Sequence, residues 1–444
     1  MLSNKSRNEW VDLCYKHWTP SAAKLYRIAN TGLELSARDC RVTDHRGRSF
    51  IDCACSYGIF LVGHANPTVK ASSISQLHQL STTPPGFSNQ PQLELSEKLR
   101  TIVPGEWGVV TYTMTGAEAI EQVIRFLLSI QAPRNRIVIM EQSYHGKTLA
   151  TMNILGQNID RNEYGLNREN IIFIPYGDFT ALESAINEQV AAVFVEPILG
   201  GAYLRVPPKG YIQRIRALCD QFGCLMVADE IQTAFGRCGK WFAIEYDRVI
   251  PDIIVLSKGL TGGYAAIAAV LYSSVLSKQA SSSIPISRNG GQPYACATAL
   301  GAIEALERDQ LIERSGLVAD KLGKGLQLLA EKYPQIIIDA PAIGLMTGLR
   351  LRGAVFEALL SMELTRRGVH AGHSMNEKAS EPVLRFYPPL TISDEDVSLV
   401  LDAIDQSLSM IISKSKWQLK LISPVIHNLY KIPYSWLSKG ASHD

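Results

Sequence analysis

The chain has 444 residues, of which 46% are hydrophobic and 19% are charged, and its formal net charge is +2. This length and composition predict a globular protein of two or three domains with large buried cores. So small a net charge gives no reason to expect nucleic acid or an anionic membrane surface as a partner.

The cysteines and the start of the chain indicate a reducing compartment. The eight cysteines show no zinc spacing, and Cys53 and Cys55 lie in an apolar segment, so we expect reduced core thiols and no metal site. The first residues lack the apolar core of a signal peptide, and no later run reaches the ~18 apolar residues of a membrane-spanning helix. These patterns predict a cytoplasmic protein that does not enter a membrane.

The N-terminal part predicts helix followed by paired strands. Residues 1–25 carry an apolar face that includes Trp10 and Trp18, which is typical of a helix packed onto the protein body. Residues 33–52 predict two strands joined by a turn at residues 44–47.

Short apolar runs and helical patterns then alternate through the middle of the chain. Helices are predicted around residues 93–102 and over 210–222. Strands are predicted at residues 109–112, 137–140, 171–174, 192–195, 225–228, 253–256 and 265–272. Such alternation indicates a mostly parallel sheet with helices on both faces.

The loop after the first of these strands has the character of a phosphate site. It contains Thr115, Gly116 and Ala117 and leads into a helical pattern. A glycine-containing loop between a strand and a helix offers unpaired backbone N–H groups and the positive end of a helix dipole. Both features favour a phosphate group.

Two further strands end in side chains whose chemistries belong together. The strand at 225–228 is followed by Asp229, and the strand at 253–256 by Ser257 and Lys258. Because ligands of open α/β sheets bind outside the carboxyl ends of the strands, we expect the acid and the lysine at one site. The pair suits pyridoxal phosphate (PLP), since a lysine amine forms a Schiff base with its aldehyde and a carboxylate keeps its pyridine nitrogen protonated.

The same stretch resembles a known family. Its motifs are Asp229-Glu230-Ile231-Gln232, Gly236-Arg237-Cys238-Gly239, Pro251-Asp252-Ile253 and Ser257-Lys258-Gly259. They are similar to the signature of the class III PLP-dependent aminotransferases, which include the ornithine, acetylornithine and 4-aminobutyrate enzymes. The resemblance implies that Lys258 is the Schiff-base lysine, that Asp229 binds the pyridinium nitrogen, and that Gln232 lies beside the phenolic oxygen of the cofactor.

The resemblance also implies a fold and a division of the chain. The expected fold is the α/β fold type I of PLP-dependent transferases. It has a large domain with a mostly parallel seven-stranded sheet and a smaller α+β domain formed by both termini. We expect the N-terminal segment of the small domain at residues 1–55 and the large PLP-binding domain at 56–300. The C-terminal small domain is expected at 301–412, followed by an additional tail at 413–444.

Phosphate binding is expected to involve two subunits of a homodimer. Thr115 and Gly116 match the phosphate loop of the family, whereas Ala117 replaces its second hydroxyl residue, a loss on the order of 1 kcal/mol. In the family's dimers, a threonine before a Gly-Gly-Asn-Pro motif reaches the phosphate of the partner's cofactor. Ser287 and Arg288 occupy this region, and either could be the contact. An arginine would form a charge-assisted pair that offsets Ala117.

The cofactor ring and the substrate have their own expected contacts. Tyr144 and His145 match an aromatic-His-Gly motif whose ring stacks on the flat, electron-poor pyridinium. Tyr57 stands where ornithine-type enzymes have a tyrosine facing the substrate, and a half-buried aromatic residue without that role is the alternative. Arg385 matches an arginine that binds the substrate carboxylate through its forked donors. Glu196 is expected beside the cofactor, and it is the candidate to neutralise Arg385 when an amine end enters.

The C-terminal third predicts helix, strands and an unusual tail. One long helical stretch is expected over 295–333, followed by strands at 336–338, 344–351 and 383–386. The tail after about residue 413 carries aromatic residues among lysines, namely Trp417, Tyr430, Tyr434 and Trp436. Packing onto the dimer surface is the expected role of the tail. Docking of a carrier protein that delivers a tethered substrate is the alternative.

Together these features predict an aminotransferase. It would move an amino group between an amine or ω-amino acid, with an ornithine-like end, and a 2-oxo acid such as 2-oxoglutarate. Two alternatives are an aminomutase or isomerase of the same fold and a PLP-binding interaction protein without turnover. Intact Asp229 and Lys258 argue against the second, and Arg385 favours transfer over isomerisation. The sequence does not identify the amine.

Overall fold

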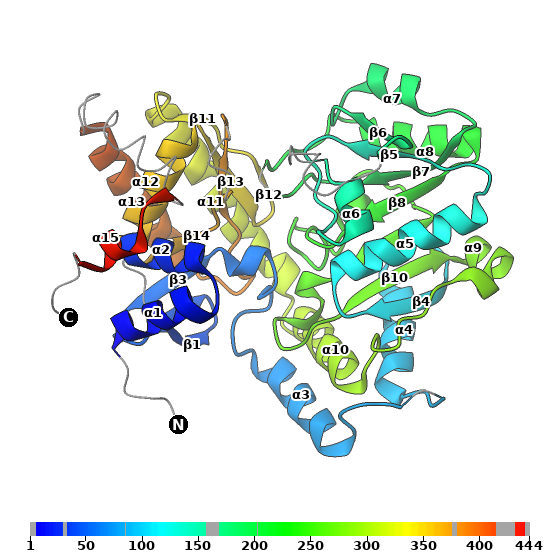
Figure 1. Ribbon diagram of the computed structural model, residues 1–444, viewed down its shortest axis with the longest axis horizontal. Coiled ribbons are helices and arrows are strands. Elements are labelled where there is room, and N and C mark those ends of the chain that lie inside the picture. The colour runs from blue at the N-terminus through cyan, green and yellow to red at the C-terminus, as the bar shows by residue number, and fades with distance from the viewer. Residues whose placement is uncertain are drawn as a thin grey trace.

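Two lobes lie side by side in the computed structural model (Figure 1). One lobe is built on a seven-stranded sheet, and the other holds two four-stranded sheets together with the helices at both ends of the chain. The structure describes residues 6–29, 33–84, 86–156, 168–201, 203–374, 380–413 and 431–439.

The large sheet has the strand order β4-β10-β9-β8-β7-β5-β6. Its strands are β4 (Trp107–Thr113), β5 (Arg136–Met140), β6 (Ile171–Ile174), β7 (Val190–Val195), β8 (Leu225–Asp229), β9 (Ile253–Leu256) and β10 (Ala268–Ser273). Strand β10 runs antiparallel to β4 and β9, whereas β9, β8, β7, β5 and β6 pair in parallel. The predicted mostly parallel sheet of seven strands is therefore confirmed.

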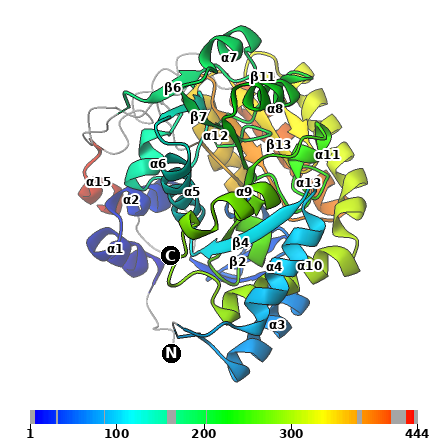
Figure 2. The ribbon, with the colours of Figure 1, turned by 90° about the vertical axis from the view of Figure 1, so that its right-hand side faces the viewer.

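Helices cover both faces of this sheet. They are α4 (Gln90–Ile102), α5 (Gly116–Ile130), α6 (Leu149–Asn153), α7 (Phe179–Ala185), α8 (Tyr211–Phe222), α9 (Ser274–Gln279) and α10 (Pro293–Arg308). Helix α3 (Pro67–Gln79) packs against α10. Because successive strand residues point to opposite faces, Val227 and Val255 pack with α5, whereas Ala228 and Leu256 belong to the core that includes α8 and α10. Figure 2 shows α4 beside β4, with α10 and α3 next to it.

The second lobe joins the two ends of the chain in one sheet. Its first sheet consists of β1 (Glu34–Arg38), β2 (Arg41–Asp44), β3 (Ser49–Cys53) and β14 (Val369–Ala371). Strand β14 pairs in parallel with β3, with Val369 opposite Ile51. The turn after Asp44 lies where it was predicted, but the strand expected before it is divided into β1 and β2 around Asp39, whose φ is +52°.

A second small sheet and three helices complete this lobe. The strands are β11 (Ile337–Asp339), β12 (Ala342–Ile343), β13 (Met346–Leu351) and β15 (Val383–Phe386). The helices are α11 (Leu311–Lys332), α12 (Ala354–Arg366) and α13 (Asp394–Ser413). The domain boundaries at residues 55, 300 and 412 stay predictions.

Two predicted helical stretches are each divided in two. The expected helix over 295–333 is wrong as one element, because α10 ends at Arg308 and α11 begins at Leu311, with Gln310 at a φ of +48° between them. Residues 1–25 also form two helices, α1 (Arg7–His17) and α2 (Pro20–Ala29). Pro20 occupies the first position of α2, where the absence of an N–H costs no hydrogen bond.

The described part of the tail lies against the N-terminal helices. Helix α15 (Tyr434–Lys439) packs against α2, and the ring of Tyr434 stacks on that of Tyr15 with centroids 3.9 Å apart. The Tyr434 hydroxyl donates to Asp12 at 2.6 Å and accepts a hydrogen bond from Arg27 at 3.2 Å. Two other aromatic residues of the predicted tail, Trp417 and Tyr430, lie outside the described residues.

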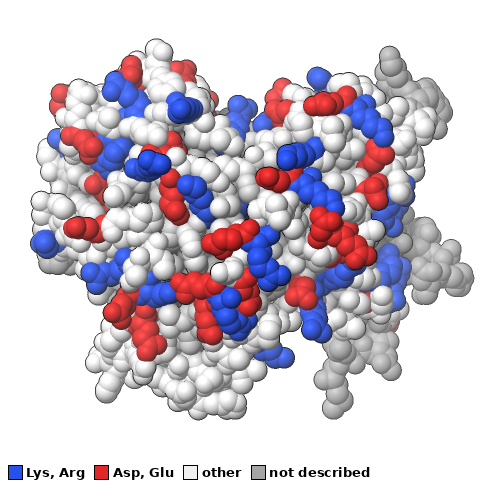
Figure 3. Space-filling view, turned by 180° about the vertical axis from the view of Figure 1, so that it is seen from behind, with Lys and Arg blue, Asp and Glu red and all other residues white. Residues whose placement is uncertain are grey.

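The surface and the cysteines agree with a globular chain. All eight cysteines are free thiols. On the face shown in Figure 3, positive and negative side chains are interspersed over both lobes. Among the described residues, no helix combines the length and the apolar character needed to cross a membrane.

Candidate active site

Five strands deliver the predicted site residues to one edge of the large sheet. Thr115 follows β4, Tyr144 follows β5, Glu196 follows β7, Asp229 ends β8 and Lys258 follows β9. Strand β4 is antiparallel to β10, which is antiparallel to β9, so β4 runs in the same direction as the other four. Their carboxyl ends therefore meet at one edge, which is where open α/β sheets bind ligands.

Asp229 and His145 form a buried pair at this edge. Asp229 is 3% exposed and His145 is 1% exposed, and a hydrogen bond of 2.7 Å joins His145 Nδ1 to Asp229 Oδ2. The other carboxylate oxygen, Oδ1, accepts the N–H of Ile231 at 3.0 Å. Burial disfavours the imidazolium, but the hydrogen bond and charge of Asp229, together with the charge of Glu196, raise the pKa of His145 above its ordinary value. His145 therefore fixes the orientation of the Asp229 carboxyl group.

Lys258 is held in a strained backbone conformation. Its φ is +44°, in the left-handed region that non-glycine residues rarely adopt, and it begins the single helical turn Lys258–Thr261. Desolvation by the surrounding protein lowers the pKa of Lys258 to about 8, although the nearby carboxylates of Glu196 and Asp229 act in the opposite direction. A substantial fraction of this amine is therefore neutral, and so nucleophilic, near neutral pH.

Glu196 is a buried carboxyl group with two backbone donors. It accepts the N–H of Tyr144 and the N–H of Gly200, each at 2.9 Å. Burial, reinforced by the negative charge of Asp229, raises the pKa of Glu196 to about 7. Small changes in its surroundings can therefore change its charge near neutral pH.

The Gly200-Gly201 segment links Glu196 to two other predicted site residues. Gly201 donates its N–H to Gln232 at 3.2 Å, and its carbonyl accepts a hydrogen bond from Arg385. A Cβ at Gly200 would lie 2.0 Å from Gln232 Oε1, so a larger residue there would displace the Gln232 amide. Within the described chain, Glu196 and Arg385 thus bind two peptide groups of one loop and not each other, and Gln232 binds the peptide group between them.

Tyr57 lies directly on Arg385. The guanidinium carbon of Arg385 is 4.5 Å from the centre of the Tyr57 ring, a cation–π geometry. The carbonyl of His373 accepts hydrogen bonds from both the Arg385 guanidinium and the Tyr57 hydroxyl, the latter at 3.3 Å. Gln232 donates to the carbonyl of Tyr57 at 2.9 Å. Tyr57, Arg385 and Gln232 therefore form one connected group, which the Gly200-Gly201 segment joins to Glu196.

The predicted phosphate loop is the N-terminus of α5. Thr115 caps the helix by accepting the N–H of Glu118 at 3.2 Å, so the preceding N–H groups of Gly116 and Ala117, which have no intrahelical partner, remain for a ligand. Ser287 donates to Glu118 at 2.8 Å and therefore lies beside this turn, whereas the neighbouring Arg288 is exposed.

Three contributions to the site were not predicted from the sequence. They are the bond between His145 and Asp229, the bridging loop at Gly200-Gly201, and the buried side chain of Arg237. The Arg237 guanidinium donates to the carbonyls of Leu345 at 3.0 Å and Pro388 at 2.7 Å, which ties the loop after β8 to the second lobe. The only indication of this role in the sequence was that Arg237 belongs to the Gly-Arg-Cys-Gly motif.

These residues fit PLP. The buried carboxylate of Asp229 suits a protonated ring nitrogen, and the Lys258 amine suits an aldehyde. Tyr144, which is 38% exposed, can cover a flat ring, and the free N–H groups at the start of α5 suit a phosphate. A buried ring nitrogen of His145, Nε2, has no hydrogen-bond partner among the described residues, so this region has capacity for a further polar group.

The family model named Aminotransferase class-III matches residues 33–408. The chain belongs to the class III aminotransferases. It is 31% identical over 413 residues to a putrescine aminotransferase from Pectobacterium atrosepticum, covering 89% of this chain and 87% of that protein. The class III assignment confirms the predicted family, enzyme class and PLP cofactor, and amino transfer between amines and 2-oxo acids is the reaction of such enzymes.

Solved structures share the fold. An ornithine aminotransferase from Toxoplasma gondii matches with a TM-score of 0.82 and 24% identity, covering 93% of this chain and 97% of that one. An acetylornithine aminotransferase from Elizabethkingia anophelis matches with a TM-score of 0.76 and 24% identity, covering 91% and 100%. The predicted fold type I architecture of the class III aminotransferases is confirmed, while the roles of individual site residues stay predictions.

Proposed function

We propose that the protein transfers the amino group of a primary amine or ω-amino acid to a 2-oxo acid such as 2-oxoglutarate, using Lys258 and Asp229 as its catalytic residues. The observation that carries the proposal is the convergence of Lys258, Asp229 and Arg385 at one edge of the sheet. The name of the putrescine aminotransferase relative supports an amine donor whose amino group is at the end of a chain.

Lys258 would hold the cofactor at its aldehyde carbon and then act as the base. PLP supplies an electron sink that makes removal of a proton from the amine-bearing carbon possible. With a pKa of about 8, the Lys258 amine can take up that proton and return it at physiological pH. The strained φ at Lys258 fixes the direction from which the amine approaches.

Asp229 would keep the ring nitrogen of the cofactor protonated. Its carboxylate is buried and already accepts hydrogen bonds from His145 and from the N–H of Ile231. Because a buried carboxylate without such partners is costly, these donors offset the cost of its burial and point it in one direction. His145 is therefore a positioning residue in this proposal.

Arg385 would bind the carboxylate of the 2-oxo acid. Its two terminal nitrogens donate to the carbonyls of Gly201 and His373, and its buried Nε has no partner among the described residues. A bidentate carboxylate is a stronger acceptor for a guanidinium than a carbonyl is, so an acid can replace these contacts. When an uncharged or cationic amine end enters instead, the present contacts to the two carbonyls keep Arg385 satisfied. Glu196, which accepts the Gly200 N–H on the same loop, supplies negative charge for such an end.

The phosphate would be held at the α5 N-terminus and completed by a second subunit. Gly116 and Ala117 supply backbone donors, and the exposed Arg288 of the other chain supplies the missing charged donor. Ser287 already donates to Glu118, which favours Arg288 over Ser287 as the residue that crosses to the partner. The protein in this proposal is a homodimer, and light scattering on a sizing column tests it.

Cytoplasmic residence and carrier-protein docking, which the sequence also suggested, each need a separate experiment. Cytoplasmic residence is tested by immunoblotting of cell fractions. Carrier-protein docking through the tail is tested by comparing free and carrier-tethered amines, with and without the residues after 413.

A half-reaction with a panel of amines tests the proposed activity. Mixing the PLP enzyme with a reactive amine in the absence of a 2-oxo acid should convert the cofactor to its amine form, which absorbance follows. Lys258→Ala should abolish this conversion while the protein still binds PLP without a covalent bond. Lys278→Ala, which removes an exposed lysine on α9, is the matched control and should behave as wild type. Wild-type conversion rates in Lys258→Ala would refute the assignment.

A further inference from the structure

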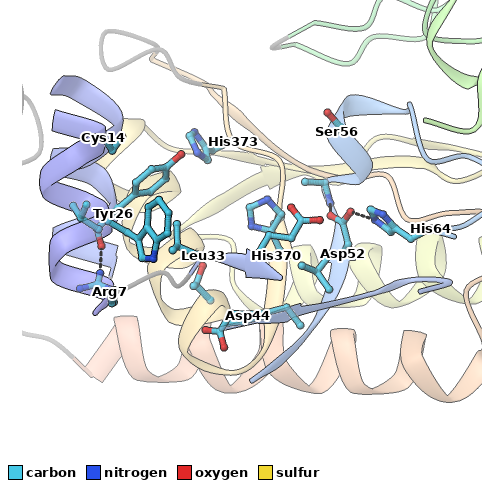
Figure 4. Close-up of a pocket in the computed structure, with 18 of the residues that line it drawn as sticks. Arg7, Cys14, Tyr26, Leu33, Asp44, Asp52, Ser56, His64, His370 and His373 are labelled. Carbon is cyan, nitrogen blue, oxygen red and sulfur yellow. Dashed lines mark hydrogen bonds and ion pairs between the residues drawn. The ribbon is translucent and has the colours of Figure 1, made fainter. Parts of the chain in front are cut away.

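A large cavity lies between the N-terminal helices and the small sheet of the second lobe. Its volume is about 850 Å³, within the range of about 300–1,000 Å³ that is usual for small-molecule pockets. Helices α1 and α2 form one wall, and β2, β3 and β14 form the other (Figure 4). The exposed area inside is mainly apolar, and its larger side chains include Trp10, Leu13, Trp18, Tyr26, Val42 and Phe50.

The helical wall of this cavity lies outside the part of the chain that matches the family. Helices α1 and α2 precede residue 33, where the match begins, and α15 follows residue 408, where it ends. Helix α15 holds this wall in place, because Tyr434 stacks on Tyr15 and hydrogen-bonds to Asp12 and Arg27. The cavity is therefore formed in part by segments that lie outside residues 33–408.

The opposite end of the cavity reaches the proposed substrate residues. Tyr57 and His373 both line it, and both contact Arg385. The Tyr57 ring has Arg385 over its face, and its hydroxyl donates to the His373 carbonyl. Tyr57 and His373 are therefore shared by the cavity wall and the proposed carboxylate site.

Two of the three carboxylates that line the cavity, Asp44 and Asp52, already have partners, and the third, Glu34, is exposed on β1. Asp52 accepts the N–H groups of Ala54 and Cys55 and is bonded to His64 at 2.8 Å. Asp44 is paired with Arg48 at 2.7 Å and accepts two backbone N–H groups. Neither carboxylate has to bind a ligand cation to be compensated.

His373, the histidine of the cavity wall that contacts Arg385, is uncharged. Burial, with the positive charges of His370 and Arg385, lowers the pKa of His373 to about 4, so its imidazole is neutral at physiological pH. Arg7 donates to the carbonyl of Tyr26. What the cavity offers a ligand is therefore aromatic and aliphatic surface.

We propose that this cavity binds the tail of the amine donor, and that the preferred donors are primary amines with a long, uncharged, apolar tail. This inference rests on the proposed amino transfer. That proposal places the amino group of the donor at Lys258, and the inference places the other end of the donor in the cavity. The tail passes Tyr57 and lies between α1 and β2, while the amino group is at Lys258. A donor with a second charged end is disfavoured, because it would bring an uncompensated ammonium against apolar walls.

A series of linear alkylamines tests the inference on the full-length PLP enzyme. From n-butylamine to n-decylamine, kcat/KM with 2-oxoglutarate should rise about fourfold for each CH₂ group that becomes buried, until the cavity is full. Diamines of the same length should be poorer donors than the monoamines. A flat series, or diamines that exceed the monoamines tenfold, overturns the inference.

Two substitutions that reduce the cavity volume from opposite walls test whether the cavity limits the length of the amine. Leu13→Trp on α1 and Val42→Phe on β2 should each end the rise at a shorter amine while leaving the rate with n-butylamine unchanged. That unchanged rate shows that the variant is folded. Leu317→Trp makes the same change at a position on α11 that is 84% exposed and outside the cavity, and it should follow the wild-type series. A wild-type series in both cavity variants overturns the inference.

A binding measurement separates this inference from the proposed activity. n-Octanol carries the tail without an amino group, so its binding does not depend on turnover. It should inhibit n-octylamine competitively, and Leu13→Trp should weaken its binding at least tenfold, measured by calorimetry. If n-octanol does not bind, the cavity assignment is wrong even when amines are converted. If n-octanol binds but no amine of any length is converted, the proposed activity is wrong, and the donor-tail assignment is wrong with it.

Discussion

Backbone strain and altered acidity coincide at Lys258. A non-glycine residue in the left-handed region costs on the order of 1–3 kcal/mol, and such strain persists where the surrounding structure enforces it. Here the residue follows a buried strand, β9, and begins a tight turn that ends at Gly262. The same crowding desolvates the amine and lowers its pKa. One local arrangement thus both directs the amine and makes it reactive.

The pH dependence of cofactor attachment should report this acidity. An ordinary lysine has a pKa of about 10.4 and is almost fully charged at pH 8. Because the pKa of Lys258 is lowered to about 8, the rate of holoenzyme formation from apoenzyme and PLP should rise with pH and reach half its plateau near pH 8. The plateau exists because the amine is neutral above that pH and cannot gain more nucleophilicity.

Stopped-flow absorbance measures this rate, and a free lysine derivative under the same conditions corrects for the titration of PLP itself. Glu196→Gln removes a negative charge that raises the pKa of Lys258, so its midpoint should move to lower pH. A corrected midpoint near pH 10 would show that Lys258 is not desolvated.

The site residues that could be predicted were those whose positions follow from the neighbouring sequence. Asp229 and Lys258 each follow a short apolar run, and strand polarity alone places them at one edge. The contact of His145 with Asp229 depends on how the loop after β5 folds back over β8, which no local pattern encodes. The same is true of Arg237, whose partners Leu345 and Pro388 lie more than a hundred positions away.

At the level of elements, the sequence predicted the sheet better than the helix ends. Buried strands are short apolar runs, and all seven strands of the large sheet, including the antiparallel β10, were recognisable. Strand β14, by contrast, has three residues, and only its pairing with the distant β3 makes it a strand. The junction of α10 and α11 was missed because Asp309-Gln310 contains neither glycine nor proline, so the hydrophobic pattern continues through it.

The conformation of Gln310 leads to a stability prediction. Left-handed backbone costs a non-glycine residue roughly 1–2 kcal/mol, and replacement by glycine removes this cost. The extra flexibility of glycine in the unfolded chain offsets about half of the stability gained in this way. Gln310→Gly should therefore raise the free energy of unfolding by about 0.5–1 kcal/mol, because Gln310 is exposed and its backbone hydrogen bonds are retained.

The same substitution inside α11 provides the control. Gln327 is exposed in the middle of this helix, so Gln327→Gly should lower the free energy of unfolding by roughly 0.5–1 kcal/mol. Urea unfolding at equal protein concentration and saturating PLP compares the two variants. Equal destabilisation in both would contradict the left-handed assignment of Gln310.

At the level of the whole molecule, the two ends of the chain and the large sheet make one site. Tyr57 comes from the segment after β3, Arg385 from β15, and Lys258 from the large sheet, and the buried Arg237 holds the lobes together at this point. In the proposed phosphate site, Ala117 has no hydroxyl group to offer, and we expect a second chain to supply the missing donor. Ser287 is engaged with Glu118, so the exposed Arg288 is the residue available to a second chain.

Loss of Arg288 should weaken PLP binding. A hydrogen bond to a charged group contributes about 1.5–3 kcal/mol, so Arg288→Ala should raise the dissociation constant of PLP about tenfold to a hundredfold. Equilibrium dialysis of the apoenzyme against PLP measures it. Arg248→Ala, which removes another exposed arginine, is the control and should leave the affinity unchanged. Unchanged affinity in Arg288→Ala would remove this residue from the phosphate site altogether.

Mixed dimers then decide which subunit each Arg288 serves. We would unfold and refold Arg288→Ala chains together with Lys258→Ala chains, so that heterodimers form. If Arg288 acts in the neighbour's site, each heterodimer contains one site with an intact Lys258 and the other chain's Arg288, and a second site with neither. Heterodimers should then show half of the wild-type number of active sites at a PLP concentration too low to saturate Arg288→Ala alone. If Arg288 instead serves its own subunit, every chain that keeps Lys258 lacks its arginine, and mixing restores no tight-binding active site. Titration of active sites at that PLP concentration separates the two outcomes, because neither parent dimer combines Lys258 with Arg288 in any site.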